Sequence, residues 1–450
     1  MNIVYITAGA AGMYCGSCMR DNTLALALRQ LGHDCLLLPT YTPIRTDERD
    51  VSSPRIFFGG ISVYLEQKFR WLRRMPGFLD RMLSQPWLLR WVSKYAIKTD
   101  AADLAALTLS MLRGVHGFQR QEVNRLLDWL RENTRPDVII LTNALLSGLV
   151  PELRRRLGVP LVITLQGDDI FLEMLPPEAR REALRLLGAN CAGVDGYLTT
   201  CRAYADFMSG YLGLPRERMH TVYPGINLEG FARPAQPPPQ KPEAVIGFLA
   251  RVSPEKGLQN LVTAFDLLMK RTDVPPCRLQ VAGYLGAHRQ EFLEEQRQRA
   301  VQAGWGDKFA YVGEPDHAGK VAFLQGLDIF SVPTDYVEPK GLYVLEALAC
   351  GVPVVQPAHG SFPELIEATG GGVLVPPRNP QALAEALLDL LRDPEKRQRL
   401  GTQGASGVAR QFTARHMAEN VAAMVQHIRA GTRPTPHAQA TGVAQATPVV

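Results

Sequence analysis

The chain has 450 residues, of which 46% are hydrophobic and 21% are charged, and its formal net charge is +5. A chain of this length is expected to form two or three domains, each large enough to bury its own core. The composition excludes a wholly disordered, collagen-like or coiled-coil protein, and the charge is too small for a dedicated nucleic-acid-binding protein. Seven irregularly spaced cysteines also argue against a disulfide framework.

The amino-terminal residues, Met-Asn-Ile-Val-Tyr-Ile-Thr, indicate a strand that begins at once. They lack the basic segment and the long apolar segment of a signal peptide, and no apolar run reaches the ~20 residues that span a bilayer. We therefore expect a cytoplasmic protein, with peripheral contact at the inner membrane face as an alternative.

Short apolar segments alternate along the chain with longer helical patterns. The segments cover residues 3–7, 35–39, 138–141, 161–165 and 197–199 in the first half, and 245–250, 279–282, 309–312, 329–332, 352–355 and 373–375 in the second. Most are apolar on both faces, as parallel strands between two layers of helices are. The alternation predicts an α/β protein with two facing Rossmann-like domains.

A proline-rich segment separates the two halves, with five prolines among residues 232–242. We predict an N-terminal domain over residues 1–227, a linker over 228–243 and a C-terminal domain over 244–412. A final helix is expected over 413–430, with its return to the first domain left open. The tail, 431–450, has no periodicity and is expected to be disordered.

The N-terminal domain is expected to carry a helical insertion over about residues 66–133. Within it, residues 68–98 contain eight Lys or Arg, six aromatic residues and one acidic residue, Asp80. An inserted helical subdomain with a solvated basic face accounts for this pattern. Contact with an anionic membrane surface, or with an acidic or sugar acceptor, is the alternative.

The most specific motif lies in the second half, where Glu338 and Glu346 are eight residues apart. Glu338 follows a strand, whereas Glu346 lies in a helix that is predicted to begin near Gly341 and end at Gly351. Apolar residues surround Glu346, and a carboxylate in such a place needs a partner. Ribose hydroxyls would satisfy it, as they do in other Rossmann-like nucleotide sites, and a lysine or solvent is the alternative.

A second motif precedes it, in which a strand ends at Arg251 and a helix begins just past Gly257. Arg251, Lys256 and the first amides of that helix are expected to point to one place. Two cations and a helix N-terminus suit a diphosphate, although two ordinary surface cations are the alternative.

The loop after the first strand contains several glycines and the pair Cys15 and Cys18. The loop is not Gly-x-Gly-x-x-Gly, which argues against a dinucleotide site. Glycines such as Gly16 permit close approach of a phosphate or sugar before the next helix. We interpret the two cysteines as small residues that line an acceptor pocket, with a redox or metal pair as the alternative.

These motifs together resemble the retaining glycosyltransferases of family 4, which have the GT-B fold and use nucleotide-diphospho-sugar donors. Other matching segments are Leu31-Gly-His-Asp, Val222-Tyr-Pro-Gly-Ile-Asn, Val281-Ala-Gly, Gly360-Ser-Phe-Pro-Glu and Gly372-Val-Leu-Val-Pro-Pro. The resemblance covers nearly the whole chain except about residues 50–135 and the tail. It implies transfer of a hexosyl group to a glycan, lipid or small-molecule acceptor with retention of configuration, and neither a metal nor another cofactor.

The resemblance also implies roles for individual residues. Arg251 and Lys256 would bind the diphosphate and stabilise the leaving group in place of a metal, and Glu338 would hold the donor sugar. Further donor-binding positions are Gly16, Gly283, Lys340, Gly341, Leu342, Glu346 and His359. The acceptor-binding positions are Cys15, Cys18, Arg20, Asn143 and Asp168.

The chain departs from the family pattern at two positions. Gln166 stands where the family usually has a histidine, and Lys340 replaces the usual aromatic residue of the glutamate motif. Glutamine hydrogen-bonds a hydroxyl but cannot act as a general base, although we place it among the catalytic residues. A degenerate GT-B protein that binds nucleotide or glycan without transfer is therefore the main alternative. A GT-B epimerase or phosphorylase and a thiol redox protein are further alternatives.

Overall fold

The computed structural model describes residues 1–9, 15–57, 101–231 and 242–431. The basic segment 68–98, the tail from 432 onward and most of the predicted linker lie outside the described residues. Among the described residues, no helix is both long and apolar enough to cross a membrane. All seven cysteines lie in the described part, and none forms a disulfide.

The N-terminal domain is built on a sheet of six parallel strands in the order β2-β1-β3-β4-β5-β6. The strands are β1 (Asn2–Thr7), β2 (Asp34–Pro39), β3 (Val138–Leu141), β4 (Leu161–Leu165), β5 (Gly196–Thr199) and β6 (Met219–Thr221). Strand β6 was not predicted, because Met-His-Thr is too short and too polar to show as an apolar run.

Side chains that alternate along these strands divide the domain's core between the two faces of the sheet. Ile3 and Tyr5 of β1 belong to the face covered by α1 (Gly16–Gln30), whereas Val4 and Ile6 belong to the opposite face. That opposite face is covered by α5 (Ala101–Leu112), α6 (Arg120–Asn133), α7 (Val150–Leu157), α9 (Pro177–Cys191) and α10 (Arg202–Leu212).

Of the predicted insertion, the structure describes α5 and α6. The apolar stripe of α6, formed by Val123, Leu126, Leu127 and Leu130, is buried in the same core as β3 and β4. The described end of the insertion is thus part of the domain's own helical layer.

The C-terminal domain has a second parallel sheet, in the order β12-β11-β10-β7-β8-β9. Its strands are β7 (Ala244–Leu249), β8 (Cys277–Ala282), β9 (Phe309–Tyr311), β10 (Ile329–Phe330), β11 (Val354–Pro357) and β12 (Gly372–Val375). Strand β10 is shorter than predicted, because the Val332 amide donates to the side chain of Gln356 rather than to a neighbouring strand.

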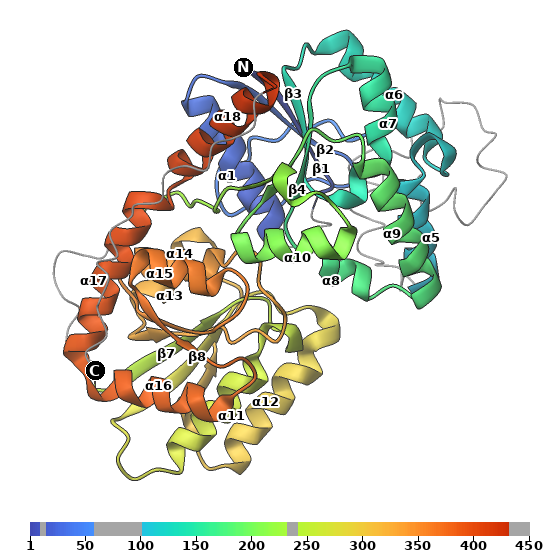
Figure 1. The fold of residues 1–450 in the computed structure, drawn as a ribbon. Helices are drawn as coiled ribbons and strands as arrows, with labels where there is room; N and C mark the ends of the chain where they lie inside the picture. The colour runs from blue at the N-terminus through green and yellow to red at the C-terminus, as the bar shows by residue number, and fades with distance from the viewer. Residues whose placement is uncertain (10–14, 58–100, 232–241, 432–450) are drawn as a thin grey trace, which may run out of the picture.

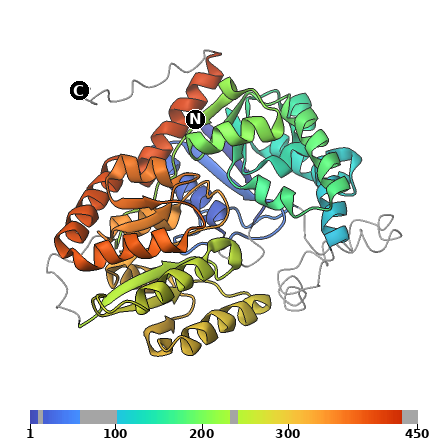
Figure 2. The ribbon, with the colours of Figure 1, turned by 60° about the horizontal axis from the view of Figure 1, so that its bottom comes forward.

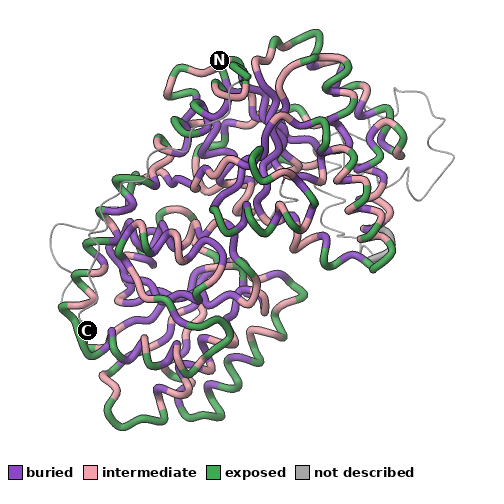
Figure 3. Tube along the Cα trace, in the orientation of Figure 1, coloured by how far each residue is buried: buried purple, intermediate pink, exposed green. Residues whose placement is uncertain are grey.

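Helices enclose this second sheet and share one apolar core with it. They are α11 (Leu258–Met269), α12 (Gln290–Gln302), α13 (His317–Gln325), α14 (Leu342–Ala349), α15 (Phe362–Thr369), α16 (Pro380–Arg392) and α17 (Pro394–Gln411). In Figure 3 the strands of both domains are buried, and exposed residues lie on the outer surfaces of the helices.

The described chain ends with α18 (Ala414–Arg429), which leaves the C-terminal domain and packs against α1 of the first (Figures 1 and 2). Met417, Val421 and Val425 of α18 are buried in the core that includes Tyr5. At the crossing point, the amide of Ile226 donates to the carbonyl of Phe412 at 2.9 Å. The two passages of the chain between the domains therefore lie side by side.

Gly225 permits this close approach. A Cβ atom at position 225 would lie 2.2 Å from the carbonyl oxygen of Thr413. Any side chain would force the two crossing segments apart.

Candidate functional site

Side chains that follow strands of both sheets meet between the two domains. The Nζ of Lys340, in the loop after β10, donates to the carbonyl of Gln166 at 2.5 Å and to the Ser17 hydroxyl at 3.3 Å. The Thr200 hydroxyl, after β5, donates to the Pro339 carbonyl at 2.6 Å. Because ligands of open parallel sheets bind beyond the carboxyl ends of the strands, this junction is the candidate site.

Glu338 lies at the centre of the C-terminal side of the site. Its carboxylate is buried and accepts hydrogen bonds from Lys256 Nζ at 2.8 Å, from the Tyr343 hydroxyl at 3.0 Å and from the Tyr336 hydroxyl. The Lys340 amide donates to the other carboxylate oxygen at 3.2 Å. The sequence analysis predicted Glu338 and Lys256 but missed both tyrosines, whose convergence on Glu338 depends on the folded loop.

The contacts of Glu338 keep it ionised. Burial alone would raise the pKa of its carboxyl, but the charges of Lys256 and Lys340 overcome burial and hold that pKa well below its usual range. Burial and the nearby Glu338 charge raise the pKa of Tyr336 and Tyr343, so both remain protonated donors. The site therefore holds a fixed negative charge paired with a buried ammonium.

Two glycines bring the strand ends close enough to assemble this cluster. Gly257 has a φ of 78°, and a Cβ there would lie 1.8 Å from the Pro333 carbonyl oxygen. Gly283, after β8, has a φ of 127°, and a Cβ there would lie 2.0 Å from the Ala250 carbonyl oxygen. Both positions thus require glycine for conformation and for space.

Arg251 is placed differently from Lys256. Its side chain is 47% exposed and forms a loose ion pair with Glu255 at 3.5 Å, whereas the side chain of Lys256 is 11% exposed. The two cations are still close enough for the charge of Arg251 to lower the pKa of Lys256, with burial as the larger cause. Arg251 therefore adds positive charge at the open edge of the site.

Gly341 and Leu342 join the two halves of the site. Gly341, with a φ of 67°, caps α14, and Leu342 is the first residue of that helix. Across the domain boundary, a Cβ at Gly16 would lie 3.6 Å from Lys340 and 3.8 Å from Leu342. The start of α1 thus lies directly against the glutamate loop.

His359 also lies next to Glu338. Its Nε2 contacts the Thr334 carbonyl at 3.0 Å, and two residues later the Ser361 amide donates to the Glu338 carbonyl at 2.8 Å. Burial lowers the pKa of His359, which favours its neutral form. Its Nδ1 is buried with no hydrogen-bond partner, so one hydrogen-bonding position of the ring is unused in this structure.

On the N-terminal side, Gln166 belongs to a buried polar network. Its amide nitrogen donates to the Thr142 carbonyl at 2.9 Å and to Asp21 at 3.4 Å. Asp21 also accepts from the Tyr5 hydroxyl at 2.7 Å and from Arg20 at 3.3 Å. The sequence analysis predicted Gln166 and Arg20 but missed Asp21.

This network contains unpaired groups. The Oε1 atom of Gln166 and two nitrogens of Arg20, Nε and Nη2, are buried without hydrogen-bond partners. Arg20 itself is 1% exposed, so its contact with Asp21 lies inside the domain and not at the domain surface. Direct contact between Arg20 and an acceptor would require the site to open.

The side chains of Asp168 and Asn143 accept hydrogen bonds from backbone amides in this structure. Asp168 accepts from the Ala144 amide at 2.6 Å and from the Gln166 amide at 3.0 Å, one on each carboxylate oxygen. Burial raises the pKa of Asp168 to about 6, although these two hydrogen bonds oppose the shift. Asn143 caps the short helix Ala144–Leu149 through the Leu146 amide at 3.3 Å. Both residues therefore shape the loops that carry Gln166.

Glu346 lies apart from Glu338, in a different set of contacts. Its carboxylate accepts from Lys320 Nζ at 2.6 Å, and the same ammonium contacts Asp47 of the N-terminal domain at 2.5 Å. A lysine thus satisfies Glu346 here, which is one of the alternatives that its apolar surroundings left open. Neither Lys320 nor Asp47 carries a sequence signal that would have marked it.

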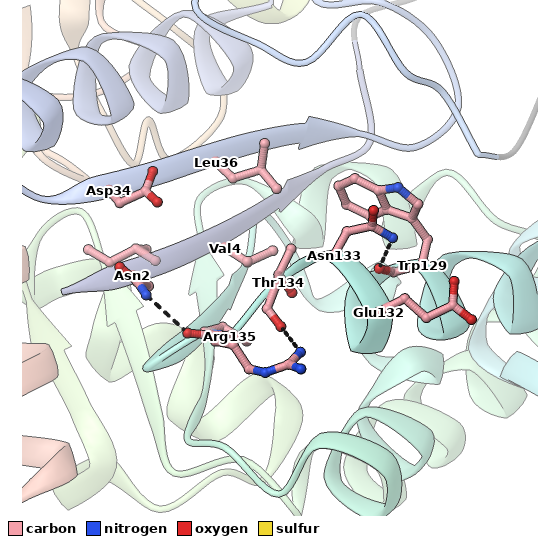
Figure 4. A pocket seen from close by; sticks show the side chains of 11 residues that line it. Asn2, Val4, Asp34, Leu36, Trp129, Glu132, Asn133, Thr134 and Arg135 are labelled. Atoms are coloured by element: carbon pink, nitrogen blue, oxygen red, sulfur yellow. Dashed lines mark hydrogen bonds between the residues drawn. The ribbon is translucent and has the colours of Figure 1, made fainter.

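Two further features bear on the choice of site. A pocket of about 640 Å³ lies at the amino ends of β1 and β2, lined by residues that include Asn2, Asp34 and Trp129 (Figure 4). It is at the opposite edge of the sheet from Gln166, so it is not part of this site.

Among the residues that the structure describes, no three His, Cys, Asp or Glu side chains are grouped to hold a metal ion.

Two family profiles match successive parts of the chain. The profile described as Glycosyl transferase 4-like domain matches residues 22–225, and the one described as Glycosyl transferases group 1 matches residues 232–406. The chain therefore belongs to the glycosyltransferases of family 4, with the GT-B fold. This confirms the resemblance that the glutamate and Arg/Lys motifs carry.

Curated relatives bear transferase names. A D-inositol 3-phosphate glycosyltransferase of Jonesia denitrificans is 31% identical over 225 residues, which are 47% of this chain and 52% of that protein. The lipopolysaccharide core biosynthesis mannosyltransferase LpsB of Rhizobium meliloti is 30% identical over a segment that makes up 49% of this chain and 63% of that protein. The matches thus span between half and two thirds of these relatives.

Solved structures agree in fold over nearly the whole chain. The Anabaena protein Alr3699/HepE, in complex with UDP, has a TM-score of 0.66 at 16% identity, covering 95% of this chain and all of that one. Sucrose-phosphate synthase from Thermosynechococcus elongatus has a TM-score of 0.67 at 18% identity, covering 96% of this chain and 100% of that one. The two-domain α/β fold that the sequence predicts is confirmed.

Proposed function

We propose that this chain transfers a hexosyl group from a nucleotide-diphospho-sugar to a hydroxyl of an acceptor, with retention of configuration. The observation that carries the proposal is the buried Lys256–Glu338 pair at the carboxyl edge of the second sheet, opposite Gln166 and the start of α1. A buried charged pair of this kind, on the C-terminal side of a site between two domains, suits the binding of a charged sugar donor.

The donor diphosphate is expected to lie over Lys256 and Arg251. Arg251 has an exposed guanidinium that is free to form paired hydrogen bonds with phosphate oxygens, apart from its loose contact with Glu255. Lys256 supplies a second positive charge at the point where charge develops on the leaving group. We infer that these cations replace a metal ion, so chelation with EDTA should leave turnover unchanged.

The sugar ring is expected to lie against Glu338, with His359 Nδ1 as a further hydrogen-bonding group. In the proposed reaction, the acceptor oxygen attacks the anomeric carbon on the face that the nucleoside diphosphate leaves. The carbon–oxygen bond to phosphate breaks, and a departing phosphate oxygen takes the acceptor's proton. No side chain needs to act as a base, which is compatible with glutamine at position 166.

The acceptor is expected to bind on the side of Gln166 and the start of α1. The relatives are named for inositol phosphate, phosphatidyl-myo-inositol and lipopolysaccharide core, all of which present ring hydroxyls. We therefore propose a ring polyol, free or as the head of a glycan or lipid. A lipid acceptor would require contact with a membrane surface, which we also propose.

The test is release of nucleoside diphosphate from a panel of UDP-, GDP- and ADP-sugars, each with inositol 3-phosphate, phosphatidylinositol vesicles or a cell glycan extract. Turnover with at least one pair is expected. Glu338→Gln and Lys256→Met should each lower kcat/KM by 10-fold or more, because a charge-assisted contact is worth about 1.5–3 kcal/mol. Lys270→Met, an exposed lysine of the same domain, serves as the matched control.

The outcomes distinguish the main alternative. Binding of a nucleotide without release from any donor sugar would favour a degenerate GT-B protein that no longer transfers. Unchanged kinetics in both site variants would overturn the assignment of Glu338 and Lys256. The configuration of the product at the anomeric carbon, read by nuclear magnetic resonance, tests retention directly.

A further inference from the structure

Cys15 and Cys18 lie together at the start of α1. Cys15 is the residue that precedes the helix, with an extended backbone (φ −112°, ψ 121°), and Cys18 lies in the first turn. Residues three apart at a helix start share one side of it. Neither cysteine forms a disulfide in this structure.

The surroundings of Cys15 favour its thiolate. The hydrogen bond from the Cys18 thiol lowers the pKa of Cys15 most, with smaller contributions from the backbone amides of Cys18 and Ser17 and from the charge of Lys340. The same hydrogen bond is the largest cause of the raised pKa of Cys18. The pair is therefore divided into one nucleophilic sulfur and one protonated sulfur.

Other cysteines of the chain lack these features. Cys15 alone among the seven is half-buried, whereas the rest are buried. Burial raises the pKa of Cys35, Cys191 and Cys201 to about 12. Exposure and thiolate character, the two conditions for thiol reactivity, thus coincide at Cys15.

We propose that Cys15 and Cys18 form a thiol–disulfide modification site that low-molecular-weight disulfides, such as glutathione disulfide, oxidise reversibly. The Cys15 thiolate attacks one sulfur of glutathione disulfide, which forms a mixed disulfide and releases one glutathione thiolate. Cys18 then loses its proton and attacks the Cys15 sulfur, which releases the second glutathione. Two thiols are oxidised and one disulfide is reduced to two thiols, so the exchange balances.

The site lies where the two domains meet. Lys340, whose charge supports the Cys15 thiolate, contacts Ser17 at 3.3 Å and belongs to the loop between Glu338 and Gly341. Oxidation replaces a negative charge with a neutral disulfide at this contact. The modification requires only the geometry of α1 and Lys340, and does not depend on the proposed transferase activity.

The sequence allows a direct test on the full chain. Residues 1–20 contain no Lys or Arg before Arg20, so trypsin releases Cys15 and Cys18 in one peptide. After native protein is treated with glutathione disulfide and then iodoacetamide, this peptide should be two hydrogens lighter than the reduced form and carry no alkyl group. Dithiothreitol should restore two alkylated cysteines, while the Cys35 peptide is unchanged throughout.

Single variants separate the roles of the two sulfurs. In Cys18→Ser, Cys15 should stop at the mixed disulfide with glutathione, whereas in Cys15→Ser the remaining Cys18 should stay unmodified. Lys340→Met should slow alkylation of Cys15 at neutral pH several-fold, and Lys270→Met should not. Absence of the disulfide in the wild-type protein, or equal reactivity of both single variants, would overturn the proposal.

Discussion

Glu338 shows how burial and pairing act on one residue. A carboxylate without partners in a protein interior would be protonated or would destabilise the fold. Here Lys256, two tyrosine hydroxyls and a backbone amide satisfy it, so the charge persists in a nearly closed space. The same contacts make this residue sensitive, since loss of either charge would leave the other buried and unpaired.

Asp168 is expected to make stability depend on pH. Its folded-state pKa, about 6, is above the value near 3.9 of an unfolded chain, so the folded protein binds the proton more tightly. Ionised Asp168 therefore costs stability above about pH 6, and the cost disappears as pH falls toward about 4. The two-unit shift corresponds to about 3 kcal/mol.

Asp168→Asn should remove this dependence. Relative to the variant, the wild-type unfolding midpoint should rise as pH falls from about 7 to 4, and the difference should be constant above pH 7. Thermal denaturation at several pH values measures it, with the exposed Asp206→Asn as control. A difference between Asp168→Asn and wild type that is the same at every pH would contradict the expectation.

Gly257 is expected to tolerate no side chain. In Gly257→Ala the new Cβ would meet the Pro333 carbonyl oxygen at 1.8 Å, in addition to the cost of a left-handed conformation. We expect a loss on the order of 3 kcal/mol or more, since strain of this kind costs about 1–3 kcal/mol before the clash is counted. Thermal denaturation measures the loss.

Gly304→Ala is the matched control. Gly304 has a similar φ of 82°, but no atom lies within 4 Å of the position that a Cβ would take. This variant should lose only about 1–2 kcal/mol, the left-handed penalty alone. Equal losses in the two variants would show that backbone approach at Gly257 is not the constraint.

At the scale of elements, one loop of the first domain docks on two helices of the second. Asp47 contacts Lys320 of α13 at 2.5 Å, and Lys320 in turn contacts Glu346 of α14. The loop is held to its own domain because the Thr23 hydroxyl of α1 donates to Glu48 at 3.0 Å. The charge cluster therefore links α1 with α14, the two helices that begin at the candidate site.

Asp47→Asn is expected to weaken this link. Lys320 would keep Glu346 but lose a buried charged partner, and breaking a buried pair costs about 3–5 kcal/mol when no other partner remains. We therefore expect a loss at or below the lower end of that range, measured by thermal denaturation. The loss should decrease at low pH, because Asp47 itself then becomes protonated. Although burial opposes the shift, the charge of Lys320 holds the pKa of Asp47 below its usual value, and the stabilisation is lost as the pH falls through that lowered pKa.

Glu314→Gln provides the comparison for Asp47→Asn. Glu314 also pairs across the domains, with Arg45 at 3.4 Å, but both side chains are partly exposed. Exposed pairs contribute about 0–1 kcal/mol, so this variant should be nearly as stable as the wild type. A loss in Glu314→Gln as large as that in Asp47→Asn would argue against a special role of the buried cluster.

At the scale of the whole molecule, the last described helix completes the core of the N-terminal domain. Helix α17 packs on α14 and α15 of the second domain, and α18 then covers α1 and β1 of the first (Figure 1). Glu364 of α15 adds a second link, since it accepts the amides of Arg202 and Ala203 at the start of α10. The N-terminal domain therefore lacks a complete core without residues from the far end of the sequence.

Truncation after residue 412 should unfold or strongly destabilise the first domain. It removes Met417, Val421 and Val425, and burial of each such side chain is worth about 1.5–3 kcal/mol, so the loss is on the order of 5 kcal/mol. Thermal denaturation and size-exclusion chromatography measure stability and aggregation. Truncation after residue 431, which keeps α18, is the control and should behave as the full chain; equal stability of both truncations would contradict the assignment.

The sequence alone determined where most strands lie and where the loop and helix that carry the two glutamates begin and end. Eleven of the twelve strands in the described residues overlap a predicted apolar run, because a parallel strand covered on both faces must be apolar throughout. Glycine at position 341 and the alternation of loop and helix placed Glu338 outside α14 and Glu346 inside it, as found. These are local properties, so a local pattern is enough to predict them.

Only the tertiary structure decided which charges meet. Lys320 pairs with Glu346 and with Asp47 from the other domain, Tyr336 and Tyr343 converge on Glu338, and Asp21 joins Gln166. Tyr336 lies in the same loop as Glu338, but the members of the other pairs lie on different elements and meet only in the folded protein, so no spacing in the sequence marks them. Which buried charges pair depends on how distant segments pack, and that packing exists only in the complete fold.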